Sequence, residues 1–144
     1  MKVLADITVP AKMESCDRLV ESATGSARQS GLAGESLFAV ELATEEAVVN
    51  IFNYAYPHQA GEVRLRCIED GDRFVIEVTD WGGPFDATSL PDPDITSPLK
   101  ERPVGGLGIY LIKKMTDEIR YAREDGRNVL KLFIRKEKTS GAAP

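Results

Sequence analysis

One stretch of the chain carries polar side chains at helical spacing within an apolar background. Residues 37–56 read LFAVELATEEAVVNIFNYAY, and Glu46, Asn50 and Asn53 recur there at i, i+4 and i+7. A helix would therefore align one carboxylate and two amides along one side. No Lys or Arg occurs from residue 29 to residue 63, so the cations that usually pair with Glu on a helix surface are missing. The stripe is either a solvated polar face or a surface suited to a positive ligand such as a metal ion.

A second candidate for chemistry follows a predicted strand. Asp80 comes directly after the alternating run of residues 73–79, and Gly82 and Gly83 follow it. This order places a carboxylate beside bare backbone that a flat ligand can approach. The carboxylate can accept a hydrogen bond from an exocyclic amino group, such as that of adenine. The alternative is a Gly-Pro turn that Asp80 starts by bonding its own backbone.

A third candidate is the glycine-rich run of residues 105–108, which precedes a predicted helix. Glycines allow several backbone N–H groups to converge, and a helix N-terminus adds the positive end of its dipole, so together they can hold phosphates. A glycine cluster can equally be a flexible hinge. The P-loop pattern G-x-x-x-x-G-K-[ST] does not occur in the sequence, so this is not a P-loop.

Apolar periodicity predicts the elements that position these residues. The predicted helices span residues 12–30, 37–56 and 109–117, the second capped by Ser36 and stopped by Pro57. The predicted strands span residues 3–9, 62–68, 73–79, 119–124 and 128–135. Residues 80–102, with four prolines, read as a long loop of the kind that is usually functional or mobile. Helices do not alternate with strands one for one. The order therefore predicts an α/β (α+β) two-layer sandwich with a mostly antiparallel, mixed sheet and its helices on one face.

The totals narrow the class of protein. With 144 residues, we expect one domain over residues 1–136 and a disordered tail over residues 137–144. The net charge of −5 argues against nucleic-acid binding through phosphate neutralisation. No apolar run is long enough for a membrane span, and no secretory signal is evident. Cys16 and Cys67 fit reduced structural thiols, so we expect a cytoplasmic protein.

The three candidates occur in a recognisable order. Glu-x-x-x-Asn on a helix, Asp-x-Gly after a strand, a long loop and then Gly-x-x-Gly before a helix resemble the N, G1 and G2 boxes of the Bergerat-fold ATPases. This histidine-kinase-like superfamily includes histidine kinases, DNA gyrase, MutL and the anti-sigma factor kinases, and the resemblance covers about residues 3–135. The large further domains of gyrase and MutL are absent, and the only histidine, His58, follows a proline. The chain is thus most similar to the anti-sigma regulatory factors, serine/threonine kinases of the RsbW and SpoIIAB type.

The resemblance implies a role for each matching position. Asn50 would be the Mg²⁺ ligand, and Glu46 would be the general base or would orient the substrate hydroxyl. Asp80 would bind the adenine amino group, with Gly82 allowing its close approach. The phosphates would be held by Gly105, Gly106, Leu107 and Gly108.

The resemblance leaves the roles of three further residues open and departs from the family at one position. Lys100 or Arg102 would reach the γ-phosphate, unless both are solvated loop charges. Asn53 would lie near the phosphates or simply on the polar stripe. Close relatives often have His where this chain has Tyr54, which bears on partner recognition more than on nucleotide binding.

The family's activity supplies the functional hypothesis. It implies a serine/threonine kinase that binds ATP or ADP with Mg²⁺, phosphorylates a STAS-domain anti-anti-sigma antagonist, and thereby switches partners with a sigma factor. A homodimer is among the assemblies the family implies. Two alternatives stay open: a non-catalytic regulator that binds ATP and sequesters a partner, and a kinase whose output is not a sigma factor.

Overall fold

The computed structural model describes residues 1–89 and 106–136. Five strands and three α-helices alternate in blocks along this part of the chain. The strands are β1 (Lys2–Pro10), β2 (Glu62–Asp70), β3 (Arg73–Asp80), β4 (Glu118–Glu124) and β5 (Arg127–Arg135). The helices are α1 (Cys16–Gln29), α2 (Gly34–Tyr54) and α3 (Gly106–Met115), with short 3₁₀ turns η1 (Met13–Ser15) and η2 (Ala87–Ser89).

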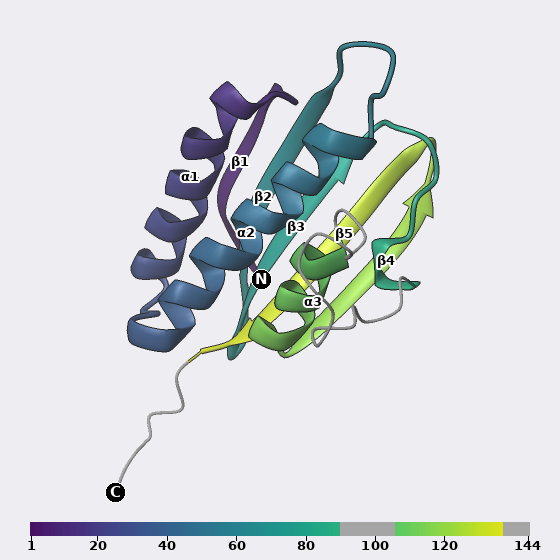
Figure 1. The fold of residues 1–144 in the computed structure, drawn as a ribbon. Coiled ribbons are helices and arrows are strands. Elements are labelled where there is room, and N and C mark those ends of the chain that lie inside the picture. Colours follow the sequence, from purple (N-terminus) through teal and green to yellow (C-terminus); the bar gives the residue numbers. More distant parts are fainter. Residues whose placement is uncertain (90–105, 137–144) are drawn as a thin grey trace, which may run out of the picture.

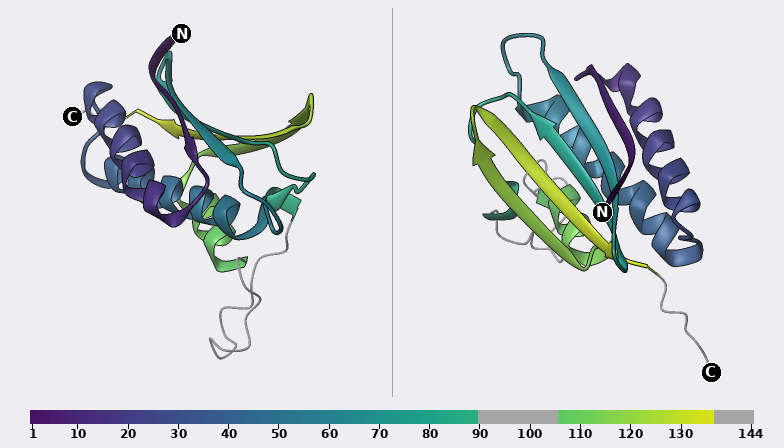
Figure 2. Two further views of the ribbon diagram at one scale, coloured as in Figure 1. Left: turned by 90° about the horizontal axis from the view of Figure 1, so that it is seen from above. Right: turned by 180° about the vertical axis from the view of Figure 1, so that it is seen from behind.

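The sheet and the helices form two layers. The strand order is β1-β2-β3-β5-β4, and each of these neighbouring pairs is antiparallel. All three helices cover one face of the sheet (Figure 1), and the view from behind in Figure 2 shows the other face without a helix. The two-layer sandwich predicted from the sequence is confirmed. All four neighbouring pairs in the described sheet are antiparallel, so this sheet is not the mixed sheet that the sequence predicted.

The core lies between the sheet and the helices. Alternate residues of each inner strand point toward the helices, and the α2 residues at helical spacing meet them. Phe74 and Ile76 of β3, Leu65 of β2 and Val40 and Val48 of α2 are fully buried there. Cys16 and Cys67 are both buried free thiols, as predicted, and burial raises the pKa of the Cys67 thiol to about 12. No helix in the described ranges is long and apolar enough to cross a membrane.

Helix ends differ from the sequence prediction. Helix α2 begins at Gly34, with Ala33 as its N-cap, and no side chain caps it. The Ser36 hydroxyl instead donates to the carbonyl of Ala33 at 2.9 Å, so the predicted Ser36 cap is wrong. Gly34 has a φ of +57°, which lets the chain turn into the helix two residues before the serine. Helix α3 likewise begins at Gly106, three residues earlier than predicted.

Candidate functional site

A pocket lies where the C-terminal half of α2 faces strands β3, β5 and β4. Its walls are mainly apolar, and its polar side chains are few. Ligand sites for small molecules commonly combine apolar walls with a few placed polar groups. The residues that line it include Asn50, Ile51, Val78, Asp80, Asn128 and Leu130.

Asp80 brings a carboxylate into this pocket from the end of β3. The residue is only 6% exposed, and its Oδ1 accepts two hydrogen bonds. One comes from the backbone N–H of Gly82 at 2.8 Å, and the other comes from the side-chain amide of Asn128 at 2.9 Å. Among the described residues, Oδ2 has no hydrogen-bond partner, so this oxygen is available as an acceptor. Asp80 therefore bonds the backbone of its own turn, which was the alternative interpretation of this motif, and also lines the pocket.

Glu46 and Gly108 come into contact although they are 62 positions apart. A Cβ atom on Gly108 would lie 2.6 Å from Oε1 of Glu46, so the first turn of α3 packs directly against the polar stripe of α2. Burial, followed by repulsion from Glu45, raises the pKa of the Glu46 carboxyl. The structure thus joins the first and third sequence motifs, and it places a half-buried carboxylate beside a helix N-terminus.

The two asparagines of the stripe lie in different surroundings. Asn50 is half-buried and lines the pocket one turn along α2 from Glu46. Its amide oxygen is the hard type of ligand that Mg²⁺ accepts when phosphates and water complete the shell, so the residue present fits that ion. Asn53 is exposed and is not among the residues lining this pocket, and both of its predicted roles stay predictions.

Gly82 is held close to the end of α2. A Cβ atom at this position would lie 2.3 Å from the carbonyl oxygen of Ala55, whereas a Cβ on Gly83 would meet open space. The Tyr56 hydroxyl fixes the same junction by accepting from the N–H of Trp81 at 2.8 Å and donating to the carbonyl of Glu62 at 2.6 Å. Packing between helix and strand therefore already requires a glycine at position 82. Its predicted role toward a ligand stays a prediction.

Sequence reasoning missed three polar residues of the pocket region, all from the β4–β5 hairpin. Asn128 of β5 lies opposite Asp80 in the strand register and binds its carboxylate. Tyr121 and Arg123 of β4 both donate to Oδ1 of Asn128, at 2.5 and 3.3 Å. Nothing in the local sequence marks these residues, because only the pairing of β3 with β5 brings them to Asp80.

Some predicted site residues cannot be placed. Lys100, Arg102 and Gly105 lie outside the described residues, as does the expected tail of residues 137–144. Gly106 and Leu107 are described as the first two residues of α3, which puts the predicted phosphate-binding run at the N-terminus of that helix.

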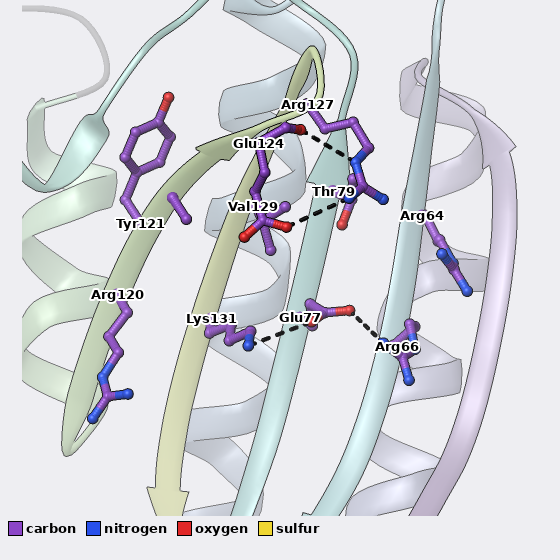
Figure 3. A pocket seen from close by; sticks show the side chains of 11 residues that line it. Arg64, Arg66, Glu77, Thr79, Arg120, Tyr121, Glu124, Arg127, Val129 and Lys131 are labelled. Atoms are coloured by element: carbon purple, nitrogen blue, oxygen red, sulfur yellow. Dashed lines mark hydrogen bonds and ion pairs between the residues drawn. The ribbon is translucent and has the colours of Figure 1, made fainter.

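A second hollow lies on the open face of the sheet and contains none of the predicted site residues (Figure 3). Glu77 of β3 sits at its centre, where it binds Arg66 at 3.0 Å and lies 3.9 Å from Lys131. At the rim, Arg64 pairs with Asp6 at 2.7 Å. Each of the five basic side chains that line the hollow lies within 4.0 Å of a carboxylate, so the hollow is an ion-paired surface.

Comparisons with known proteins agree with the arrangement of motifs. Residues 9–134 match the family model of the histidine kinase-like ATPase domain. The chain is similar to the serine-protein kinase RsbW of Bacillus cereus strain AH187, with 32% identity over 87% of this chain and 81% of the relative. RsbW of Bacillus mycoides is 31% identical over the same shares.

A solved structure shows the same fold. The histidine kinase AdeS of Acinetobacter baumannii superposes with a TM-score of 0.51, covering 92% of this chain and 68% of that one. Its sequence identity is 12%, so the likeness concerns the fold alone.

Proposed function

This chain belongs to the histidine kinase-like ATPase family, in the branch of the anti-sigma kinase RsbW, and from that premise we propose that it is a Mg-ATP-dependent protein kinase. Its substrate would be a serine or threonine of a STAS-domain antagonist protein. The observation that carries the proposal is the contact of Glu46 with Gly108, one helical turn from the Asn50 that lines the Asp80 pocket. This contact brings the third motif against the helix that also lines the pocket through Asn50, which supports a single site built from all three motifs.

The pocket suits an adenine ring. Ile51 of α2 and Val78 and Leu130 of the sheet provide apolar walls, against which a flat base can be buried. Asp80 supplies the hydrogen-bond acceptor for the exocyclic amino group. With the base held there, the triphosphate would extend along the polar stripe of α2 toward the N-terminus of α3, where unpaired backbone N–H groups favour anions.

Asn50 would hold the magnesium ion through its amide oxygen. A bound Mg²⁺ neutralises phosphate charge and orients the phosphoryl group. Asn50 contributes by fixing the position at which that charge is received, one turn of α2 away from Glu46. Lys100 or Arg102 would add a positive charge at the γ-phosphate.

Glu46 would act as the base. It accepts the proton of the substrate hydroxyl while that oxygen bonds to the γ-phosphorus, and the bond from the γ-phosphorus to its bridging oxygen breaks to release ADP. A carboxylate with a raised pKa is a better proton acceptor near neutral pH than an ordinary glutamate, and burial raises the pKa of Glu46 in this way.

The biological output follows from the family rather than from the pocket. Phosphorylation of the antagonist would release it, leaving the kinase free to bind a sigma factor or another regulator. A homodimer is part of this proposal. The relatives' printed name, serine-protein kinase, supports the reaction class and leaves the partner to be identified.

Transfer of labelled phosphate tests the proposal. The purified protein is incubated with Mg²⁺, γ-labelled ATP and a purified STAS-domain protein from the same genome, beside the Glu46→Gln variant. We expect the wild type to label a serine or threonine of the STAS protein, and the variant to bind ATP equally but transfer nothing. Equal labelling by both would remove Glu46 as the base. ATP binding without transfer to any STAS protein of that genome would favour the non-catalytic sequestering regulator.

A further inference from the structure

We propose that Asn128 sets the selectivity of the pocket for a 6-amino purine over a 6-oxo purine by positioning Asp80. The inference rests on the proposed nucleotide function and extends it to a residue outside the three motifs. Asn128 is 6% exposed, lines the pocket and is paired with Asp80 in the antiparallel register of β3 and β5. It therefore reaches the carboxylate from a neighbouring strand, independently of the Asp-x-Gly turn.

The orientation of the Asn128 amide is determined by its surroundings. Its Oδ1 faces three groups: the Tyr121 hydroxyl at 2.5 Å, the Arg123 guanidinium at 3.3 Å and the backbone N–H of Phe85 at 3.4 Å. The guanidinium and the backbone N–H can only donate. A flipped amide would direct its NH₂ at those donors, so the carbonyl oxygen must stay on this side.

The opposite side of the amide is equally fixed. The Nδ2 group donates to Oδ1 of Asp80 at 2.9 Å and to the carbonyl of Gly83 at 2.8 Å. Both partners are acceptors, so a flip would bring oxygen against oxygen. Arg123 binds the adjacent loop as well, donating to the carbonyl of Gly82 at 2.6 Å. The hairpin thus holds the carboxylate and the loop that follows it as one unit.

This arrangement decides what Asp80 can recognise. Two donors, the N–H of Gly82 and the amide of Asn128, occupy Oδ1, and the carboxylate cannot rotate without losing both. Its other oxygen has no partner in the described part of the chain and is left as a fixed acceptor. A purine with an amino group at carbon 6 can donate to it, whereas a 6-oxo purine would direct a carbonyl oxygen at it. Sites that hydrogen-bond a specific group discriminate strongly against an analogue that leaves the site unpaired.

The ratio of two affinities measures this role. Calorimetric titration gives the dissociation constants for ATP and for inosine triphosphate, which differ at carbon 6, in the presence of Mg²⁺. We expect the wild type to prefer ATP by tenfold or more and Asn128→Ala to reduce that preference by about tenfold, the effect of one hydrogen bond to a charged group. Asn128→Asp, of nearly the same shape, should reduce it too, because it sets a carboxylate oxygen against Asp80. Arg127→Ala is the matched control, because Arg127 is the neighbouring residue of β5, lines the open-face hollow and pairs with Glu124 at 3.4 Å; it should keep the ratio within about twofold.

The outcomes separate this inference from the proposed function. Equal weakening of both nucleotides by Asn128→Ala and Asn128→Asp, with the ratio preserved, would overturn the positioning role and leave a structural one. If Asp80→Asn collapses the ratio while both Asn128 variants keep it, only the inference fails. If the wild type binds neither nucleotide, or if Asp80→Asn leaves the ratio unchanged, the proposed nucleotide site fails first. Should Asn128→Ala not fold, the Asn128→Asp ratio still decides.

Discussion

Strand β3 carries two buried carboxylates, and their different surroundings separate a binding position from a structural one. Asp80 is 6% exposed and Glu77 is 9% exposed, yet they point to opposite faces of the sheet because they are three residues apart. Glu77 is balanced by cations, with Arg66 at 3.0 Å and Lys131 at 3.9 Å. Within residues 1–89 and 106–136, the donors to Asp80 are neutral and both bind one oxygen.

The difference shows which carboxylate is prepared for a ligand. A buried charge without a paired cation is costly unless hydrogen bonds or a ligand satisfy it. Glu77 receives that compensation from its own sheet, so it has no remaining need for a partner. Oδ2 of Asp80 has no hydrogen-bond partner among the described residues, and Asp80 lines the mainly apolar pocket. The following predictions test this contrast between the pocket under the helices and the ion-paired open face.

The largest effect is expected at the magnesium position. Asn50→Ala should weaken Mg-ATP binding by at least about a hundredfold, because the only protein ligand assigned to the ion is lost. Lys131→Ala on the open face is the matched control and should leave the affinity within about twofold, since Lys131 pairs only with Glu77 in the described part of the chain. Calorimetric titration with and without Mg²⁺ measures both. Retained binding in Asn50→Ala would remove this residue from the site.

Replacing each carboxylate of β3 by its amide should affect a different property: ATP binding at Asp80 and the stability of the fold at Glu77. Asp80→Asn should weaken ATP binding by about tenfold to a hundredfold, because it replaces an acceptor oxygen of the carboxylate with an amide of mixed character. Glu77→Gln should leave ATP affinity unchanged. Its free energy of unfolding should fall by about 1 kcal/mol, because it weakens two ion pairs at the centre of the open face. Titration calorimetry and urea denaturation distinguish the two effects. Reduced ATP affinity in Glu77→Gln would contradict the assignment of the faces.

Two neighbouring glycines test the junction behind Asp80. Gly82→Ala should destabilise the fold by about 1–3 kcal/mol, since overpacking forces the backbone to shift and the added Cβ would lie 2.3 Å from the Ala55 carbonyl oxygen. Gly83→Ala should have little effect, because its Cβ would meet no atom within 4 Å. Thermal denaturation gives both values. Equal stability of the two variants would show that strand and helix are not held this closely.

The smallest effect is a pH-dependent one at Glu46. Burial raises the pKa of its carboxyl in the fold, so the folded state favours the protonated form. The resulting stability is present below the ordinary pKa of glutamate and is lost as the pH rises through the raised value. Glu46→Gln should therefore gain melting temperature over the wild type as the pH rises above the ordinary pKa of glutamate, about 4.3. A melting-temperature difference that does not change with pH would contradict the raised pKa.

Kinase activity should also depend on the protonation of Glu46, but it should increase as the carboxyl loses its proton. Since the proposed base works as the carboxylate, phosphoryl transfer should decline as the pH falls through the raised pKa of Glu46. Glu45→Gln, which removes the second cause of the shift, should move this decline to lower pH. Rates of transfer to the STAS protein across this range provide the measurement, and an unchanged profile in Glu45→Gln would contradict the coupling.

Local pattern was enough to predict the elements and the α2 stripe. The spacing of Glu46 and Asn50 identified the helix side that meets α3 and the pocket. In the turns between β2 and β3 and between β4 and β5, Gly71, Asp125 and Gly126 have the positive φ values that tight hairpin turns need. What the sequence could not show depends on contacts between distant segments. Asn128 is 48 positions from Asp80, and its partnership exists only through the β3–β5 register.

The local sequence also did not predict where helix α2 begins or why a glycine is needed at position 82. Ser36 looked like a cap, yet the turn made by Gly34 starts the helix earlier. Gly82 looked like a residue for ligand approach, and the structure shows in addition that α2 occupies the space beside it. In both cases a tertiary contact or a backbone angle decides, and neither can be seen in a window of neighbouring residues.

The central claim is that nucleotide binds under the helices beside Asp80 and not on the open face of the sheet. An NMR titration of ¹⁵N-labelled protein with Mg²⁺ and a non-hydrolysable ATP analogue tests it most directly. The account predicts that amide signals of Asn50, Gly82 and Asn128 shift with the analogue while those of Arg66 and Glu77 stay unchanged. Shifts confined to the open face, around Glu77, would contradict it.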